Sequence, residues 1–191
     1  MNTVKREIQW LLKEKYGGAP CPAFLKDAER IKKGEPADYV IGWTDFLGCR
    51  ISLSKKPLIP RPETEYWVNE AIKEIKAERK GKKVRCLDIF AGSGCIGIAA
   101  LKHIPFAVAD FAEKEKSFCE QIADNLKQNN IARRRYSVIQ SDMFSRVRKR
   151  YDAIFANPPY VATQRIYNVQ KSVLKWELKR ALFAGKDGLF Y

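Results

Sequence analysis

The sequence feature that most constrains the fold is a glycine-rich turn between a short apolar run and a helical stretch. The run covers residues 84–90, the glycines are Gly92, Gly94 and Gly97, and the helical stretch covers residues 96–103. Three more apolar runs and a second helical stretch follow, at residues 106–110, 136–140, 152–156 and 117–129. Strands that alternate with helices are typical of βαβ units with right-handed crossovers. The sequence therefore predicts an α/β protein with a doubly wound, Rossmann-like parallel sheet.

Two helices are expected before this pattern. Val4, Ile8 and Leu11 recur at helical spacing, and a second short helix is expected around residues 23–33. Together they predict a short helical appendage at residues 1–36.

A hairpin and a proline-rich segment follow the appendage. The runs 39–43 and 49–53 predict two strands, the second with apolar and polar residues in alternation. These strands give a β-hairpin linker at residues 37–60. Three prolines then favour an extended segment before a helix that begins near Thr64, a residue type suited to the N-cap. Residues 61–191 form the remaining domain, which carries the glycine turn.

The composition excludes several classes of protein. The chain has 191 residues with a formal net charge of +14, and 46% of its residues are hydrophobic. No apolar run approaches the roughly 18 residues that cross a bilayer, and the first residues lack the apolar core of a secretory signal, so we expect a cytoplasmic protein without a membrane span. The five cysteines form no Cys-x-x-Cys pair, and His103 is the single histidine. We therefore expect no disulfide framework, no metal site and no Ser/His catalytic pair.

The glycine turn predicts a nucleotide-like ligand. Its Gly-x-Gly-x-x-Gly spacing matches a dinucleotide fingerprint, and the N-terminus of the following helix offers free N–H groups. Asp110 is expected to end the second strand, where its carboxylate would accept hydrogen bonds from ribose hydroxyls. Asp88 precedes the glycines and would attract a cation and repel a pyrophosphate. This favours S-adenosylmethionine, with its ammonium and sulfonium charges, over NAD.

The segment Asn-Pro-Pro-Tyr, residues 157–160, follows the fourth predicted strand. Ligands of open α/β sheets bind at the carboxyl ends of the strands, so this segment and the glycine turn should face one crevice. Two prolines make a rigid rim of outward carbonyls, Asn157 adds a side-chain acceptor, and Tyr160 offers a flat face. Such a rim suits a planar NH₂ group, whose hydrogens must be held while its nitrogen is aimed at a methyl carbon.

Several segments together resemble one family. Ile-Pro-Arg-Pro-Glu-Thr-Glu at 59–65 matches the family's most distinctive signature, and residues 87–97 resemble its cofactor turn. Further similar segments lie at residues 34–48, 141–144, 157–160 and 177–189. The chain is therefore similar, over nearly its whole length, to the release factor glutamine N5-methyltransferases (the PrmC/HemK family).

The resemblance implies a class I S-adenosylmethionine-dependent methyltransferase domain at residues 61–191. The implied reaction moves a methyl group from S-adenosylmethionine to the side-chain amide nitrogen of the glutamine in the Gly-Gly-Gln motif of class I peptide chain release factors. The partner is then a release factor, and the positive charge would help the protein approach it or the ribosome.

Roles for individual residues follow from the same resemblance. The catalytic residues would be Asn157, Pro158 and Tyr160. The cofactor would be held by Asp88, Phe90, Ala91, Gly92, Ser93, Gly94, Asp110, Asp142, Met143 and Asn157. The substrate would be held by Asn157, Pro158, Pro159, Tyr160, Arg61, Glu63 and Thr64, with residues 61–65 at the closed end of the pocket.

The chain departs from the family in three respects. Phe90 replaces the usual first glycine, so the backbone there is expected to avoid a glycine-only conformation. The helical appendage is shorter than the corresponding part of the family. Members also continue beyond the point that matches Tyr191, which would leave strand 152–156 at an edge of an incomplete sheet. We therefore expect a fragment of a longer reading frame, truncated on its C-terminal side.

Three alternatives remain open. An NAD-dependent oxidoreductase would explain the glycine spacing but leaves residues 157–160 without a role. A nucleic-acid methyltransferase acting on adenine N6 or guanine N2 shares the Asn-Pro-Pro-Tyr motif, and the basic clusters at 79–83, 133–135 and 146–150 would attract phosphate. An inactive cofactor-binding fragment is the third.

Overall fold

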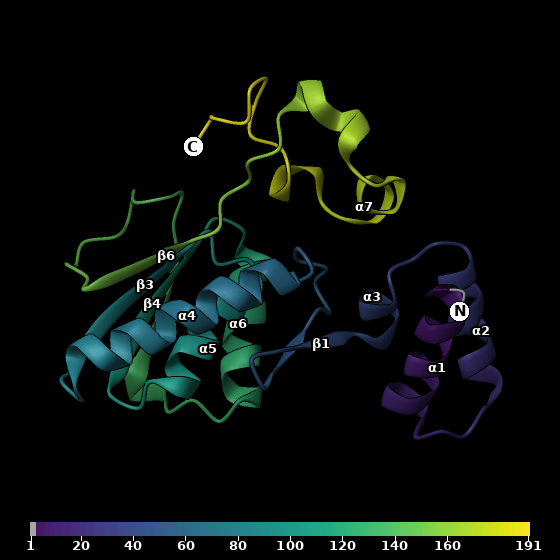
Figure 1. The fold of residues 1–191 in the computed structure, drawn as a ribbon, viewed down its shortest axis with the longest axis horizontal. Coiled ribbons are helices and arrows are strands. Elements are labelled where there is room, and N and C mark those ends of the chain that lie inside the picture. Colours follow the sequence, from purple (N-terminus) through teal and green to yellow (C-terminus); the bar gives the residue numbers. More distant parts are fainter. Residues whose placement is uncertain (1–2) are drawn as a thin grey trace.

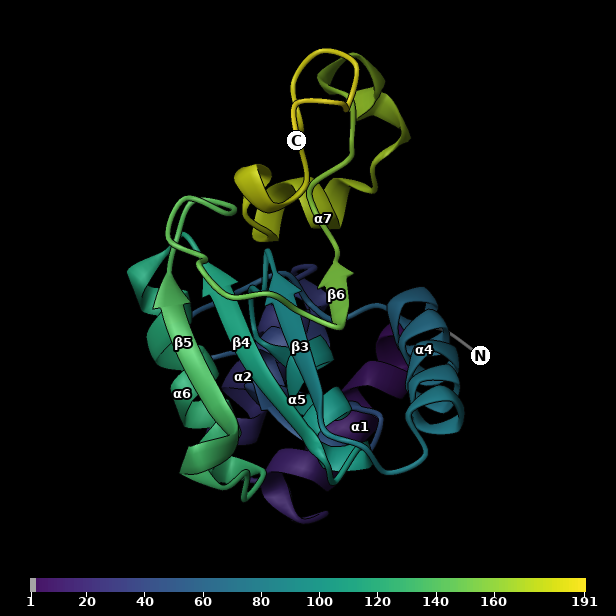
Figure 2. The same ribbon diagram turned by 90° about the vertical axis from the view of Figure 1, so that its left-hand side faces the viewer.

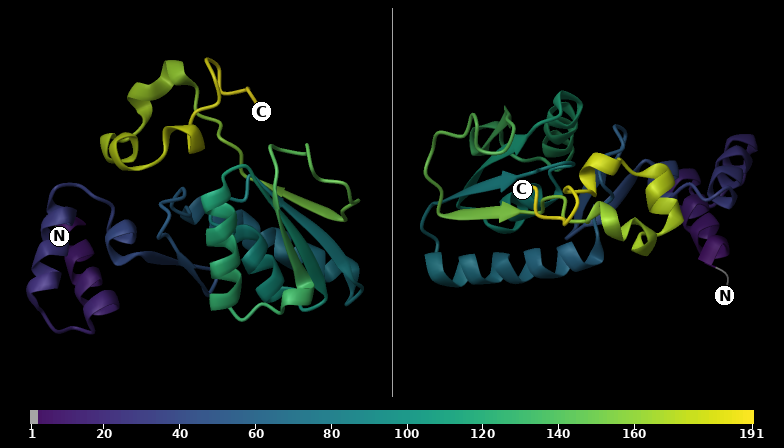
Figure 3. Two further views of the ribbon diagram at one scale, coloured as in Figure 1. Left: turned by 180° about the vertical axis from the view of Figure 1, so that it is seen from behind. Right: turned by 90° about the horizontal axis from the view of Figure 1, so that it is seen from above.

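The computed structural model describes residues 3–191, and its first part is a small helical lobe (Figure 1). The lobe consists of α1 (Thr3–Tyr16), α2 (Pro22–Lys32) and the short α3 (Ala37–Ile41). It has its own apolar cluster, separate from the core of the sheet, formed by Leu11, Phe24, Ala28, Ile31, Ala37, Val40 and Ile41. The lobe stands at one end of the molecule, and the hairpin connects it to the sheet (Figure 3).

The prediction of a strand at 39–43 is wrong for its first three residues, which belong to α3. Pro36 lies at the N-cap with a φ of −55°, and Gly42 ends the turn with a φ of +95° while its N–H donates to the Asp38 carbonyl at 2.8 Å. Three consecutive apolar residues show neither a helical nor a strand period, so the flanking proline and glycine decide the conformation. The hairpin is therefore shorter than expected and consists of β1 (Trp43–Phe46) and β2 (Cys49–Ser52), which pair antiparallel.

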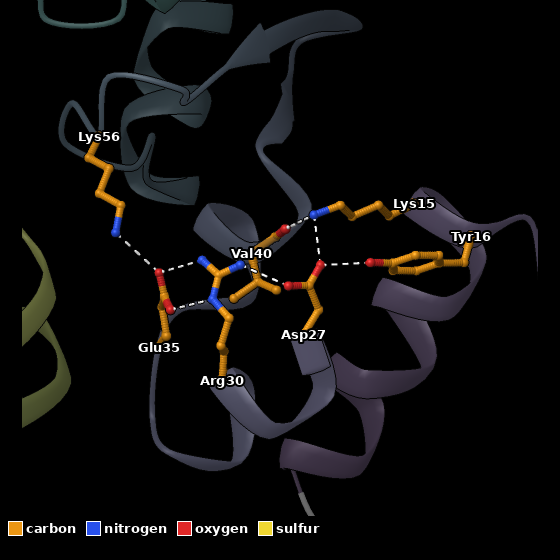
Figure 4. A network of polar contacts seen from close by, with 7 residues as sticks. All are labelled: Lys15, Tyr16, Asp27, Arg30, Glu35, Val40 and Lys56. Atoms are coloured by element: carbon orange, nitrogen blue, oxygen red, sulfur yellow. Dashed lines mark hydrogen bonds and ion pairs between the residues drawn. The ribbon is translucent and has the colours of Figure 1, made fainter. Parts of the chain in front are cut away.

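A network of charged side chains joins the helices of the lobe (Figure 4). The Asp27 carboxylate accepts hydrogen bonds from Lys15, Tyr16 and Arg30, each at 2.8 Å. The Arg30 guanidinium also donates two hydrogen bonds to Glu35, at 2.8 and 2.9 Å. Lys56, from the loop after the hairpin, reaches Glu35 at 3.2 Å, so the network extends from α1 to that loop.

Replacing Asp27 by asparagine should destabilise the lobe by about 1–2 kcal/mol at neutral pH. The stability of the variant should also change less than that of the wild type when the pH is lowered. Burial alone would raise the pKa of Asp27, but the hydrogen bonds from Lys15, Tyr16 and Arg30 outweigh it and lower the pKa. The stabilisation is therefore present above the unfolded-state pKa, about 3.9, and is lost as the pH falls through the folded-state pKa. Circular-dichroism melts between pH 2.5 and 7 measure both effects. Glu29→Gln, on the exposed side of α2, is the control and should leave the melting temperature nearly unchanged.

The sheet has four parallel strands in the order β5-β4-β3-β6. The strands are β3 (Val84–Ile89), β4 (Ala107–Glu113), β5 (Tyr136–Gln140) and β6 (Ala153–Ala156), and the helices are α4 (Pro62–Arg79), α5 (Cys95–His103) and α6 (Lys116–Gln128). Side chains of α4, α5 and α6 share the main core with one face of the sheet. On the other face Leu87, Ile89 and Ala112 contact Met143, Val147 and Tyr151, from the connection between β5 and β6.

Most element boundaries shift slightly from the predictions, and two of these shifts concern predicted site residues. Helix α4 begins at Pro62 with Arg61 at its N-cap, and Thr64 lies inside the first turn as a buried residue. Proline is favoured at the first helical position because its fixed φ suits the helix and no N–H is lost there. Strand β4 continues to Glu113, because pairing with β5 extends to Glu113 and Gln140.

Helix α6 carries a row of buried amides that fixes the hairpin to the sheet domain. Asn129 accepts from the Arg50 N–H at 3.0 Å and donates to the Arg50 carbonyl at 2.8 Å. One turn earlier, Asn125 accepts from the Ser52 N–H at 2.9 Å and also donates to the Ser93 carbonyl of the glycine turn at 3.0 Å. The side chains thus satisfy the outer edge of β2 as a neighbouring strand would.

Strand β6 forms the edge of the sheet, because it pairs with β3 alone and Ile154 is 53% exposed. After β6 the chain continues above the carboxyl ends of the strands (Figure 2). It contains two 3₁₀ segments (Thr163–Asn168 and Lys179–Ala181) and the short helix α7 (Lys171–Trp176). None of the helices within residues 3–191 has the length and apolar character needed to cross a membrane.

Candidate active site

A pocket opens at the carboxyl ends of β3 and β4, the position expected for a ligand of an open α/β sheet. It encloses about 850 Å³, including the part open to solvent. The lining residues are Leu58, Phe90, Gly92, Ala112, Glu113, Lys114, Glu115, Phe118, Ser141, Asp142, Met143, Asn157, Pro159, Arg180, Ala181 and Tyr191. The pocket thus brings together the glycine turn, the loop after β5, the Asn-Pro-Pro-Tyr segment and the chain beyond α7.

The acidic residue at the end of β4 is Glu113, not Asp110 as predicted. Asp110 lies in the middle of the strand, and its carboxylate accepts hydrogen bonds from Lys149 and Tyr151, both at 2.8 Å. Glu113 lines the pocket instead and accepts hydrogen bonds from the N–H groups of Gly92 and Glu115, both at 2.8 Å. Because each carboxylate oxygen has a second lone pair, Glu113 can still accept hydrogen bonds from a ligand.

Phe90 adopts a left-handed backbone conformation, although the sequence predicts that a residue other than glycine avoids it. Its φ is +59°, and Met143, on the neighbouring wall of the pocket, has a φ of +48°. A left-handed residue other than glycine costs about 1–2 kcal/mol. The apolar contacts of Phe90 and Met143 with the Leu87–Ile89–Ala112 cluster offset this cost. The glycine turn therefore keeps its shape even though phenylalanine stands at the first position.

Asp88, in β3 before the turn, and Gly97, in α5 after it, lie outside the pocket lining. Asp88 is 1% exposed, and its Oδ2 accepts a hydrogen bond from the Gly97 N–H at 2.8 Å. Burial raises the pKa of Asp88 to about 8, against the lowering effect of this hydrogen bond. A Cβ at Gly97 would lie 2.4 Å from the Phe111 ring, so this glycine allows α5 to pack closely on β4. The predicted attraction between Asp88 and a cationic ligand therefore has no direct contact to support it.

Of the ten residues predicted to hold the cofactor, five line the pocket. These five are Phe90, Gly92, Asp142, Met143 and Asn157. The other five do not line the pocket, and they are Asp88, Ala91, Ser93, Gly94 and Asp110. Among the latter, Gly94 is the N-cap of α5, where its φ of +78° starts the helix, and the buried Ser93 accepts from Asn125 through its carbonyl.

The Asn-Pro-Pro-Tyr segment reaches the pocket through Asn157 and Pro159. Pro158 and Tyr160 lie outside the lining, and Tyr160 is 72% exposed. The chain just after this segment is tied to the chain beyond α7. Val161 donates to the Leu182 carbonyl at 2.9 Å and accepts from the Ala184 N–H at 3.0 Å.

Gly188→Ala should displace the Asn-Pro-Pro-Tyr segment and reduce activity without unfolding the sheet. Gly188 has a φ of +85°, and an added Cβ would lie 2.5 Å from the Tyr160 carbonyl oxygen, so backbone must move. We expect at least a tenfold loss in the rate of methyl transfer, the reaction that the family resemblance implies, about 1.4 kcal/mol in barrier, with little change in the melting temperature. Gly185→Ala is the control, since its added Cβ would meet only a side-chain atom, 3.5 Å away, at a similar φ of +77°. Equal rates for the two variants would contradict the prediction.

The signature at 61–65 does not line the closed end of the pocket as expected. Arg61 forms an ion pair with the buried Glu177, and Glu65 accepts a hydrogen bond from the Leu47 N–H at 2.7 Å. Thr64 is buried in the first turn of α4, and Glu63 is exposed. The signature therefore joins parts of the fold, and the residue of this region that lines the pocket is Leu58.

Several pocket residues were missed by the sequence reasoning. Arg180 and Glu115 form an ion pair at 3.1 Å, and Lys114 pairs with Asp142 at 2.8 Å. The signal that could have indicated Glu113 is its place at the junction of a strand and a helix, three residues after Asp110.

Within residues 3–191 no group of three His, Cys, Asp or Glu side chains could hold a metal ion.

The fold and the position of the pocket define the class of protein. The structure resembles the hMettl16 catalytic domain in complex with a MAT2A 3′UTR hairpin, with a TM-score of 0.54 over 75% of this chain and 54% of that chain, at 20% identity. This similarity, with the parallel sheet, confirms the Rossmann-like fold of class I methyltransferases.

Sequence comparisons identify the family. The family described as Conserved hypothetical protein 95 matches residues 52–183, and the chain belongs to it. The predicted resemblance is also confirmed. A protein named release factor glutamine methyltransferase from Lactococcus lactis is 31% identical over 96% of this chain and 66% of its own length. Its counterpart from Thermodesulfovibrio yellowstonii is 36% identical over 85% of this chain and 58% of its own length. The chain thus spans about three fifths of the length of these relatives.

Proposed function

We propose that this chain carries the active site of an S-adenosylmethionine-dependent protein-(glutamine-N5) methyltransferase. Its substrate is the glutamine of the Gly-Gly-Gln motif in class I peptide chain release factors. The observation that carries the proposal is that one pocket joins Asn157, at the end of β6, to Glu113 and Gly92, at the ends of β4 and β3. The names of the relatives support the choice of acceptor. In this proposal residues 61–191 form the catalytic domain, preceded by a helical appendage (1–36) and by a linker (37–60) that begins with α3 and contains the hairpin.

The pocket residues fit S-adenosylmethionine. Glu113 offers a carboxylate to the ribose hydroxyls, and Asp142 and Met143 flank the place of the adenine. Three carboxylates line the pocket against two cations, because Arg180 pairs with Glu115 and Lys114 pairs with Asp142, and the remaining negative charge, at Glu113, suits the cationic sulfonium and ammonium groups. The cofactor supplies a methyl group bound to positively charged sulfur, and the chain must hold and orient it.

The Asn-Pro-Pro-Tyr segment, of which Asn157 and Pro159 line the pocket while Pro158 and Tyr160 lie outside the lining, suits a primary amide. The Asn157 side-chain oxygen and the Pro158 carbonyl would accept the two amide hydrogens, and the exposed Tyr160 ring would pack on the amide plane. Fixing the nitrogen in line with the methyl carbon can contribute roughly 7–11 kcal/mol to lowering the barrier. Such a reaction depends on positioning, which accords with a pocket lining that contains no histidine.

Methyl transfer to defined acceptors tests this function. The chain is incubated with S-adenosylmethionine labelled in the methyl group and with a release factor, its Gln→Ala variant, DNA or ribosomal RNA. We expect label on the release factor and none on the Gln→Ala variant. Label on either nucleic acid would support the adenine or guanine methyltransferase instead, and binding of the cofactor without any label would support an inactive fragment.

A further inference from the structure

The buried carboxylate of Glu177 lies where two walls of the pocket meet. Glu177 is 5% exposed and ends α7. Its Oε2 accepts a hydrogen bond from the Ile59 N–H at 3.2 Å, and its Oε1 pairs with Arg61. Leu58, next to Ile59, forms one wall of the pocket, and Arg180 and Ala181, which follow Glu177, form another.

We propose that Glu177 is a positioning residue that holds these two walls in register for the cofactor. The inference rests on the proposed function of the pocket. A buried carboxylate that loses its partners destabilises the fold, so the hydrogen bond to Ile59 and the ion pair with Arg61 hold the loop at 57–61 and the chain after α7 together. Glu177 touches neither the pocket nor a reacting atom, and it acts through Leu58 and Arg180.

A second set of contacts supports the same junction. The Lys56 ammonium lies 5.7 Å from the centre of the Trp176 ring and 5.6 Å from that of Tyr39. The Tyr39 hydroxyl donates to the Pro57 carbonyl at 2.7 Å. The loop is therefore fixed by α3 on one side and by Trp176 and Glu177 on the other.

The far end of the second wall is also fixed. Arg180 pairs with Glu115 at 3.1 Å, so the chain after Glu177 crosses the pocket and meets the junction of β4 and α6. Displacing Glu177 would shift Arg180 and Ala181 relative to Glu113 and Glu115. The expected effect is on affinity for the cofactor, since both walls contact its site.

Glu177→Gln tests the proposal because it keeps the size of the side chain and removes its charge. Binding of S-adenosylhomocysteine, measured by calorimetry, should weaken about tenfold, while Glu70→Gln, at an exposed ion pair on α4, should leave it unchanged. Hydrogen exchange should rise at residues 57–61 in Glu177→Gln alone. Arg61→Met should weaken the binding of S-adenosylhomocysteine about threefold, whereas Arg61→Lys should keep most of the wild-type affinity. The double variant Arg61→Met/Glu177→Gln should bind with the same affinity as Glu177→Gln, because both changes break the same ion pair.

The outcomes separate the two proposals. The role of Glu177 would be overturned if Glu177→Gln bound S-adenosylhomocysteine with wild-type affinity. It would also be overturned if the loss of binding were no greater than the fraction of the variant that is unfolded. If Glu177→Gln does not fold, Arg61→Met decides, since Arg61 is 35% exposed and its removal leaves the Ile59 hydrogen bond in place. Unchanged affinity in Arg61→Met would then overturn the proposal. Failure of the wild-type chain to bind S-adenosylhomocysteine would instead count against the proposed function, and hydrogen exchange would still test the junction.

Discussion

In the proposed reaction, Asn157→Ala should lower methyl transfer to the release factor by about 10²–10³-fold, the loss typical of removing one preorganised polar contact to a reacting group. Asn157 follows β6 and lines the pocket, and the proposed function assigns its side-chain oxygen to an amide hydrogen of the acceptor. Because the rest of the cofactor site stays intact, affinity for S-adenosylmethionine should remain within about threefold of the wild type, under about 0.7 kcal/mol. Single-turnover transfer and calorimetric binding measure the two quantities separately.

Ser145→Ala is a suitable control, since Ser145 lies in the loop after β5 in a neighbouring hollow and outside the main pocket lining. It should retain both binding and transfer. A parallel loss of binding and transfer in Asn157→Ala would assign Asn157 to the cofactor alone and remove it from the acceptor site.

Glu113→Gln should weaken binding of S-adenosylmethionine by about 10–100-fold, equivalent to roughly 1.4–2.7 kcal/mol. The carboxylate accepts hydrogen bonds from Gly92 and Glu115 and so orders the turn and the strand end together. An amide has one acceptor oxygen, so Gln at this position can satisfy only one of the two N–H groups and loses its charge. Calorimetric titration with S-adenosylmethionine measures the change in affinity.

Asp110→Asn is the matched control, because Asp110 lies in the same strand but binds Lys149 and Tyr151 on the face of the sheet. It should lower the melting temperature and leave cofactor affinity nearly unchanged. The reverse result, with Asp110→Asn losing affinity and Glu113→Gln keeping it, would restore the original assignment from sequence.

The sequence predicted the sheet and its helices well because short apolar runs and helical periods are local signals. All four parallel strands and the helices between them lie at the predicted places, with small shifts at their ends. The family resemblance and the Rossmann-like fold are also confirmed. These features depend on residues that are close together along the chain.

The errors at the candidate site arose where distant residues decide the outcome. The end of β4 is set by its pairing with β5, so the local pattern misplaced the acidic residue by three positions. The signature residue Arg61 finds its partner Glu177 116 positions away, a contact that no local spacing reveals. Phe90 takes a positive φ while it packs against the Leu87–Ile89–Ala112 cluster and its ring meets that of Tyr191, tertiary contacts that override its intrinsic preference.

The order of the strands has a consequence for how the molecule assembles. Residues paired between β3 and β4, such as Cys86 and Ala109, are close in sequence, whereas the pairing of Cys86 with Ala153 closes a much longer loop. Longer loops cost more entropy to close, so β6 is expected to join the sheet last and to detach first. Native-state exchange should therefore show the amides of β6 opening before those of β3 and β4. The strand that positions Asn157 would then be the least protected strand of the sheet, and a bound ligand that contacts Asn157 would slow its exchange.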